Sequence, residues 1–142
     1  MSTEQRLRRL EDLEEIRQLF VDYGHHLDRG DVEAYAALFA EEGEVLLGPL
    51  GRATGPTAIA ELMRGALQGV TGSSFHLIAN PIIDLQSEEH ATAEVTWAVV
   101  ARGADGTPEL TMLGRHVDRA TAAAPGGPRG DPPALRRLRP PP

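Results

Sequence analysis

The chain has 142 residues, of which 41% are hydrophobic and 25% are charged, and this composition favours one soluble domain with one core. The formal net charge of -7 argues against a broad nucleic-acid-binding surface, and no apolar run reaches the roughly 18 residues of a membrane-spanning helix. The absence of cysteine excludes disulfides, thiolate nucleophiles and zinc–cysteine sites. Because the N-terminus is charged rather than apolar, we expect a cytoplasmic protein without a signal peptide.

Two helices are predicted in the first 40 residues. Apolar residues recur every three or four positions from residue 4 to residue 29, which is the pattern of a helix with one buried face. Gly30 suits the end of this helix. Asp31 has the position of an N-cap for a second helix, which we expect to extend to about Ala40.

A short hairpin and a third helix are predicted next. Residues 45–48 and 52–54 form the two hairpin strands, joined by a turn that contains proline and glycine. Gly55-Pro56 then opens a helix that reaches about Gln68. Proline is favoured in the first turn of a helix, where its missing N–H group has no intrahelical partner.

Three longer strands are predicted over residues 74–85, 91–102 and 109–119, with polar turns between them. Pro81 requires a break, a bulge or an edge position in the first of these strands. The resulting order is helix, helix, hairpin, helix and antiparallel meander. This order predicts an α+β fold in which the helices pack on one face of a curved sheet.

The C-terminal segment, residues 121–142, differs in composition from the rest of the chain. It contains seven of the 11 prolines and shows no apolar periodicity. Such a composition is typical of disordered segments. We therefore divide the chain into a domain over residues 1–120 and a disordered tail over residues 121–142.

An acidic and a basic side chain on separate elements are the main candidates for chemistry. Asp28 falls at the predicted end of the first helix, and His76 falls within the first long strand. A carboxylate that orients an imidazole and stabilises its charged form makes histidine a usable base near neutral pH. No histidine has a partner at metal-ligand spacing, so we predict neither a metal site nor a cofactor.

Six segments, in this order and spacing, resemble the nuclear transport factor 2-like superfamily and, within it, the SnoaL-like group. The segments are residues 16–23, 27–31, 38–40, 55–59, 75–80 and 114–119. Proteins of this kind are cones, in which a bent antiparallel sheet wraps a deep apolar pocket covered by helices. The resemblance therefore implies a pocket for a small, hydrophobic, cyclic molecule, and it implies a homodimer.

The resemblance also implies lyase chemistry of the dehydratase or dehydrochlorinase type. Members of that type pair an aspartate at the end of the first helix with a histidine on the first long strand, and Asp28 and His76 match these positions. Tyr23 matches a tyrosine that some dehydratases place near the substrate. One departure is that this chain has no counterpart to the final-strand arginine of hexachlorocyclohexane dehydrochlorinase.

Four side chains are candidates for substrate binding. Tyr23 and Asn80 would polarise a substrate oxygen, and Trp97 would form a wall of the pocket. Arg115 and His116 occupy opposite faces of the last predicted strand, because side chains alternate along a strand. Only one of these two can point inward, and we include His116 as the candidate.

Other functional classes stay open. The first is an isomerase or polyketide cyclase in which Asp28 itself is the base, and the second is a non-catalytic ligand-binding or assembly module. A third reading follows from the C-terminal segment, because the family normally continues past Arg119 into one more strand that we do not find. We hypothesise that the tail is a frameshift product. The strand that begins near Glu109 would then be an exposed edge, which favours association.

Overall fold

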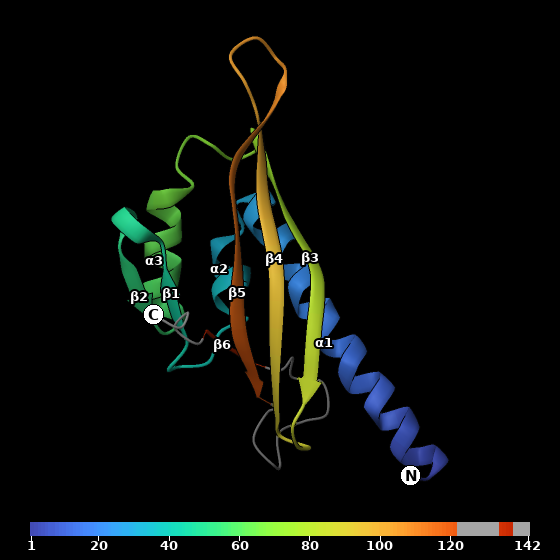
Figure 1. Cartoon of the computed structure of the whole chain (residues 1–142). Helices are drawn as coiled ribbons and strands as arrows, with labels where there is room; N and C mark the ends of the chain where they lie inside the picture. The colour runs from blue at the N-terminus through green and yellow to red at the C-terminus, as the bar shows by residue number, and fades with distance from the viewer. Residues whose placement is uncertain (122–133, 138–142) are drawn as a thin grey trace.

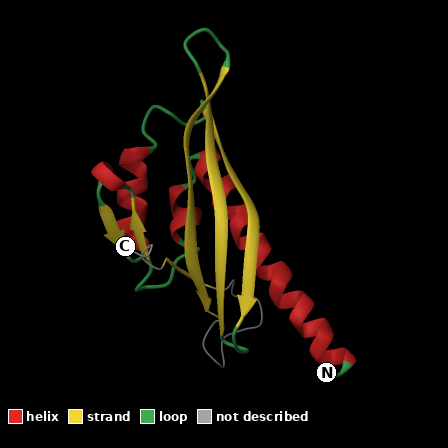
Figure 2. Ribbon diagram, in the orientation of Figure 1, coloured by secondary structure: helices red, strands yellow, loops and turns green. Residues whose placement is uncertain are grey.

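A curved antiparallel sheet forms one layer of the molecule, and the helices lie against one of its faces (Figures 1 and 2). The computed structural model describes residues 1–121 and 134–137. The main sheet has the strand order β3–β4–β5–β6, and β1 and β2 form a separate two-stranded sheet. The predicted α+β class, with three helices before an antiparallel meander, is confirmed.

The helices and strands follow the predicted order. The helices are α1 (Thr3–Arg29), α2 (Val32–Ala36) and α3 (Pro56–Ala66), with a 3-10 turn at Gly48–Leu50. The strands are β1 (Glu44–Leu46), β2 (Arg52–Thr54), β3 (Ser74–Leu85), β4 (His90–Arg102), β5 (Pro108–Thr121) and β6 (Ala134–Arg137).

Both ends of α1 are capped by local hydrogen bonds. Ser2 and Gln5 form a capping box, in which each side chain accepts a hydrogen bond from the backbone N–H of the other residue. Gly30 ends the helix in the left-handed conformation, with φ of 71°, which a residue without a Cβ adopts at low cost. Leu7 and Leu10 belong to the predicted apolar face but are exposed, because the first turns of α1 extend past the end of β3 (Figure 1).

The second helix is shorter than predicted. The side chain of Asp31 caps α2 by accepting a hydrogen bond from Ala34 N at 3.1 Å, as expected. The helix ends at Ala36 rather than near Ala40, because the backbone N–H groups of Leu38 and Phe39 make i to i-3 hydrogen bonds, to Tyr35 and Ala36, instead of i to i-4 bonds. Leu38 and Phe39 are nevertheless buried, so these predicted core residues lie in the core although their backbone is not α-helical.

Proline interrupts β3 as a bulge. The pairing of β3 with β4 shifts register between Ala79 and Ile82, and Asn80 in this gap has a positive φ of 52°. Proline has no N–H group to donate to a neighbouring strand, so its place in an irregular position leaves no ladder hydrogen bond missing.

The turn between β4 and β5 is held by local hydrogen bonds. The side chain and the backbone N–H of Thr107 both donate to the carboxylate of Asp105, and these hydrogen bonds lower the pKa of Asp105.

A fourth strand extends the main sheet. Strand β6 pairs antiparallel with the end of β5, from Asp118 to Thr121. No strand was predicted after β5, and that prediction is wrong, because β6 pairs through its backbone and shows no apolar pattern in the sequence. Residues 122–133 and 138–142 lie outside the described residues, so the boundary near residue 120, the disorder of the tail and the frameshift hypothesis stay predictions.

The core lies between the sheet and the helices. Apolar side chains from all three helices and from the inward face of β4 and β5 form one cluster. Its largest fully buried side chains are those of Leu19, Tyr35, Val45, Ile59 and Val95. No helix among the described residues is long and apolar enough to cross a membrane.

Candidate active site

The predicted aspartate and histidine meet. Oδ1 of Asp28 lies 2.8 Å from Nδ1 of His76, and the same oxygen accepts a hydrogen bond of 2.8 Å from the backbone N–H of His76. The two side chains are 18% and 19% exposed, so the contact is shielded from water without being closed off. An ionised carboxylate only accepts hydrogen bonds, so this contact favours the neutral tautomer of His76 in which Nδ1 carries the proton and Nε2 has the lone pair.

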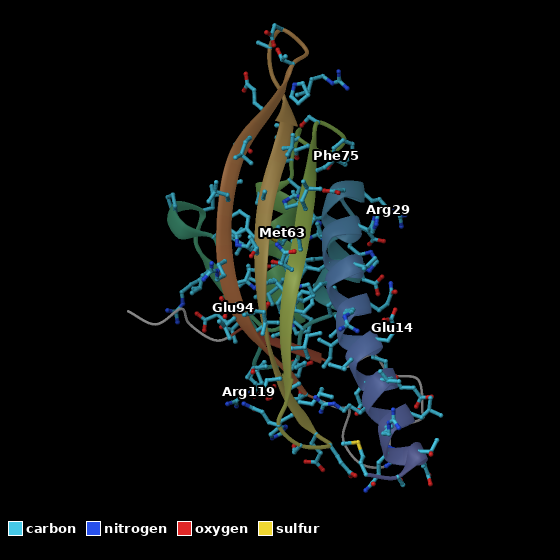
Figure 3. The ribbon with its side chains drawn as sticks, turned by 45° about the vertical axis from the view of Figure 1, so that its right-hand side comes forward. Glu14, Arg29, Met63, Phe75, Glu94 and Arg119 are labelled. Carbon is cyan, nitrogen blue, oxygen red and sulfur yellow. The ribbon has the colours of Figure 1, made fainter. Side chains whose placement is uncertain are left out.

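The fold explains why this contact forms. Strand β3 is at the edge of the sheet, so the N–H groups on its outer side have no strand partner. Helix α1 runs beside this edge (Figures 1 and 3) and brings Asp28, in its last turn, to the N–H of His76. Gly24 permits the close approach, because a Cβ at this position would lie 3.2 Å from the carbonyl oxygen of His76.

A groove runs along this seam between α1 and β3. Apolar side chains form most of its surface, and three polar residues, His25, Asp28 and His76, also line it. The apolar lining residues are Phe20, Val21, Gly24, Phe75, Leu77, Ile78 and Ala79. The groove therefore offers a hydrophobic surface beside a carboxylate-bound imidazole, which suits an apolar molecule with one reactive position.

The predicted substrate-binding residues lie elsewhere. Tyr23 packs in an aromatic cluster, with its ring centroid 4.9 Å from that of Tyr35 and 6.0 Å from that of His116. Asn80 is exposed at the bulge of β3. Trp97 is half-buried and covers Gly114, where an added Cβ would lie 2.6 Å from the indole ring. The lining of the groove includes none of Tyr23, Asn80, Trp97 and His116.

The structure answers which face of β5 points inward. His116 is 5% exposed and faces the core, whereas Arg115 lies on the outer face and pairs with Glu94 at 3.2 Å. Asp118 follows on the inward face and is 3% exposed. Its Oδ2 lies 2.5 Å from Nδ1 of His116, although neither atom is in hydrogen-bonding alignment.

This second histidine–aspartate pair was missed in the sequence. The spacing of His116 and Asp118 could have revealed it, because residues two apart on a strand point to the same face of the sheet. The pair is buried, so it differs from the pair in the groove by being closed to solvent. Among the described residues, no group of three or more His, Asp or Glu side chains is placed to hold a metal ion.

Comparisons with known proteins agree with the sequence resemblance. The family model described as the SnoaL-like domain matches residues 8–126. An NTF2-like protein with a cystatin-like fold from Novosphingobium aromaticivorans is 28% identical, with a TM-score of 0.79 over 96% of this chain and 83% of that chain. No curated protein matches the chain.

Two further solved structures are similar. A protein of Novosphingobium aromaticivorans that is provisionally assigned as a scytalone dehydratase is 25% identical, with a TM-score of 0.67 over 93% of this chain and 87% of that chain. A protein of Catenulispora acidiphila in complex with S-DNPA is 21% identical, with a TM-score of 0.71 over 91% of this chain and 92% of that chain. The NTF2-like fold implied by the six sequence segments is confirmed.

The buried pair generates a prediction about stability. Asp118→Ala leaves the imidazole of His116 enclosed in the core without the carboxylate beside it, and leaving a buried polar group unsatisfied typically costs about 1–3 kcal/mol. We expect the free energy of unfolding in a urea titration to fall by an amount of this order. The double variant His116→Leu with Asp118→Leu should lose less than Asp118→Ala alone, because no polar atom is left unpaired. A double variant that is the less stable of the two would contradict this account.

Proposed function

Because this chain belongs to the SnoaL-like domain family, we propose that it is a lyase that eliminates a small leaving group from a hydrophobic, cyclic carbonyl compound. The observation that carries the proposal is the double contact of Asp28 Oδ1 with the ring and the backbone of His76, each at 2.8 Å. This contact holds an imidazole at the edge of an apolar groove, and in the Nδ1–H tautomer that it favours, Nε2 would accept the proton.

In the proposed reaction, Nε2 of His76 removes a proton from the carbon beside the substrate carbonyl. Asp28 keeps the ring in the reactive tautomer and stabilises the imidazolium that forms. A positioned base of this kind contributes roughly 10²–10⁴-fold to the rate. The mechanism needs no cofactor. Four side chains predicted to bind the substrate do not line the groove, namely Tyr23, Asn80, Trp97 and His116. Their roles in substrate binding stay predictions.

We also propose that two copies associate through the outer face of the main sheet. Two rows of apolar residues cross this face from β3 through β4 to β5. The rows are Phe75, Val100 and Leu110, and then Leu77, Ala98 and Leu113. The four large side chains on β3 and β5 are each more than half exposed. A contiguous apolar patch of this kind is characteristic of a protein interface.

The chemical role of His76 is tested with a substrate that reports elimination directly. The probe is 3-hydroxy-1-tetralone, whose dehydration yields fluorescent 1-naphthol. We expect His76→Ala to lower kcat/KM by roughly 10²–10⁴-fold, and Asp28→Asn to lower it by less, because the ring stays in place but loses the carboxylate charge. His90→Ala, at the exposed start of β4, is the matched control and should retain wild-type turnover.

The outcomes separate the proposed lyase from its rivals. If His76→Ala retains activity while Asp28→Asn loses it, the carboxylate is the base, as in the isomerase or cyclase reading. If the wild-type protein binds apolar cyclic ketones but turns over none of them, the chain is a binding module. Either result removes the proposed role of His76.

The dimer is tested by placing a charge in the apolar rows. We expect Leu113→Glu to halve the molar mass in light scattering, because burying an unpaired carboxylate at an interface is costly. Leu50→Glu changes an equally exposed leucine far from this face and should leave the mass unchanged. A wild-type protein that is monomeric at high concentration would rule out the interface.

A further inference from the structure

We propose that His25 is the general acid of this elimination, which protonates the leaving oxygen while His76 removes the carbon-bound proton. The inference rests on the proposed lyase function and deepens it. The base, His76, lies on the β3 side of the groove, and the proposal gives His25, on the α1 side, the role of proton donor. It also narrows the substrate class to compounds with a hydroxyl leaving group.

The placement of His25 is the first support. His25 precedes Asp28 by three residues on α1, and residues at this spacing share one face of a helix. The groove is lined by His25 and Asp28 from α1 and by His76 from β3. Its two walls therefore each carry an imidazole, with the carboxylate joined to only one of them.

A concerted elimination uses two groups, one that takes a proton and one that gives a proton. Hydroxide is a poor leaving group, so the breaking carbon–oxygen bond needs a proton on its oxygen. In His76, Nδ1 is held by Asp28, so only Nε2 is open for proton transfer. While Nε2 is taking the proton from carbon, it has none to give to oxygen. A separate donor in the groove supplies this proton at the same moment.

The exposure of His25 suits a donor. Its side chain is exposed, so its ring can exchange protons with water between turnovers. His116 is enclosed in the core, and His26 and His90 are not among the residues that line this groove. His25 is therefore the histidine with access both to solvent and to the groove of His76.

The proposed step balances. The proton on the carbon beside the carbonyl passes to Nε2 of His76, and the carbon–hydrogen electron pair becomes the new carbon–carbon double bond. The carbon–oxygen bond breaks, and the leaving oxygen takes a proton from the imidazolium of His25 and departs as water. His76 then loses one proton to solvent and His25 regains one.

A pair of substrates with different leaving groups tests the proposal. Both 3-hydroxy-1-tetralone and 3-acetoxy-1-tetralone give 1-naphthol, but acetate leaves without needing a proton. We expect His25→Gln, which keeps polarity but transfers no proton, to lower kcat/KM for the hydroxyl compound by roughly 10²-fold or more and to leave the acetoxy compound at the wild-type value. His76→Ala should lose both activities. His26→Gln, the same change one position along α1, should lose neither.

Each other result overturns the proposal in a recognisable way. An equal loss on both substrates in His25→Gln makes His25 a structural or binding residue. No loss on the hydroxyl compound means that His76 alone handles both protons. If the wild-type protein turns over neither compound, the lyase function itself fails and the acid fails with it. A thermal melt of His25→Gln, an exposed position, verifies that the variant is folded.

Discussion

One carboxylate oxygen joins the end of α1 to the free edge of the sheet. Oδ1 of Asp28 satisfies the backbone N–H of His76, which has no strand partner, and at the same time orients the imidazole of that residue. An edge strand exposes unpaired N–H groups, and a carboxylate is a strong acceptor for them. The same contact therefore joins the helix to the sheet, satisfies a backbone group at the edge and orients the imidazole that we propose as the base, so that structure and proposed chemistry depend on a single atom.

The chain contains two histidine–aspartate pairs in opposite environments. The pair of Asp28 and His76 lies at an apolar groove and is partly open to water. The pair of His116 and Asp118 is enclosed by the core and lies beside Tyr23. Burial removes the second pair from the reach of a substrate, and it is the reason why we expect the loss of one partner to lower stability. Position in the fold, rather than residue type, thus distinguishes the pair that we propose as reactive from the enclosed one.

Sequence patterns predicted the elements whose causes are local. Cap residues such as Asp31 and the proline bulge in β3 follow from backbone chemistry within a few residues, and the contact of Asp28 with His76 follows from the family resemblance. Features set by long-range packing were missed. Strand β6 pairs through its backbone, so its residues show no pattern, and the exposure of Leu7 depends on how far α1 extends past the sheet. The groove also lies at the α1–β3 seam, where neither element alone reveals it.

The tautomer of His76 shows directly whether Asp28 prepares this histidine as a base. Two-bond hydrogen–nitrogen NMR correlations of a ¹⁵N-histidine-labelled sample, assigned with His76→Gln, report which ring nitrogen carries the proton in the neutral form. If Asp28 orients the ring, we expect the proton on Nδ1 in the wild-type protein and a mixture of both tautomers in Asp28→Ala. A proton on Nε2 in the wild type, or the same spectrum in Asp28→Ala, would contradict the claim that Asp28 prepares His76 as a base.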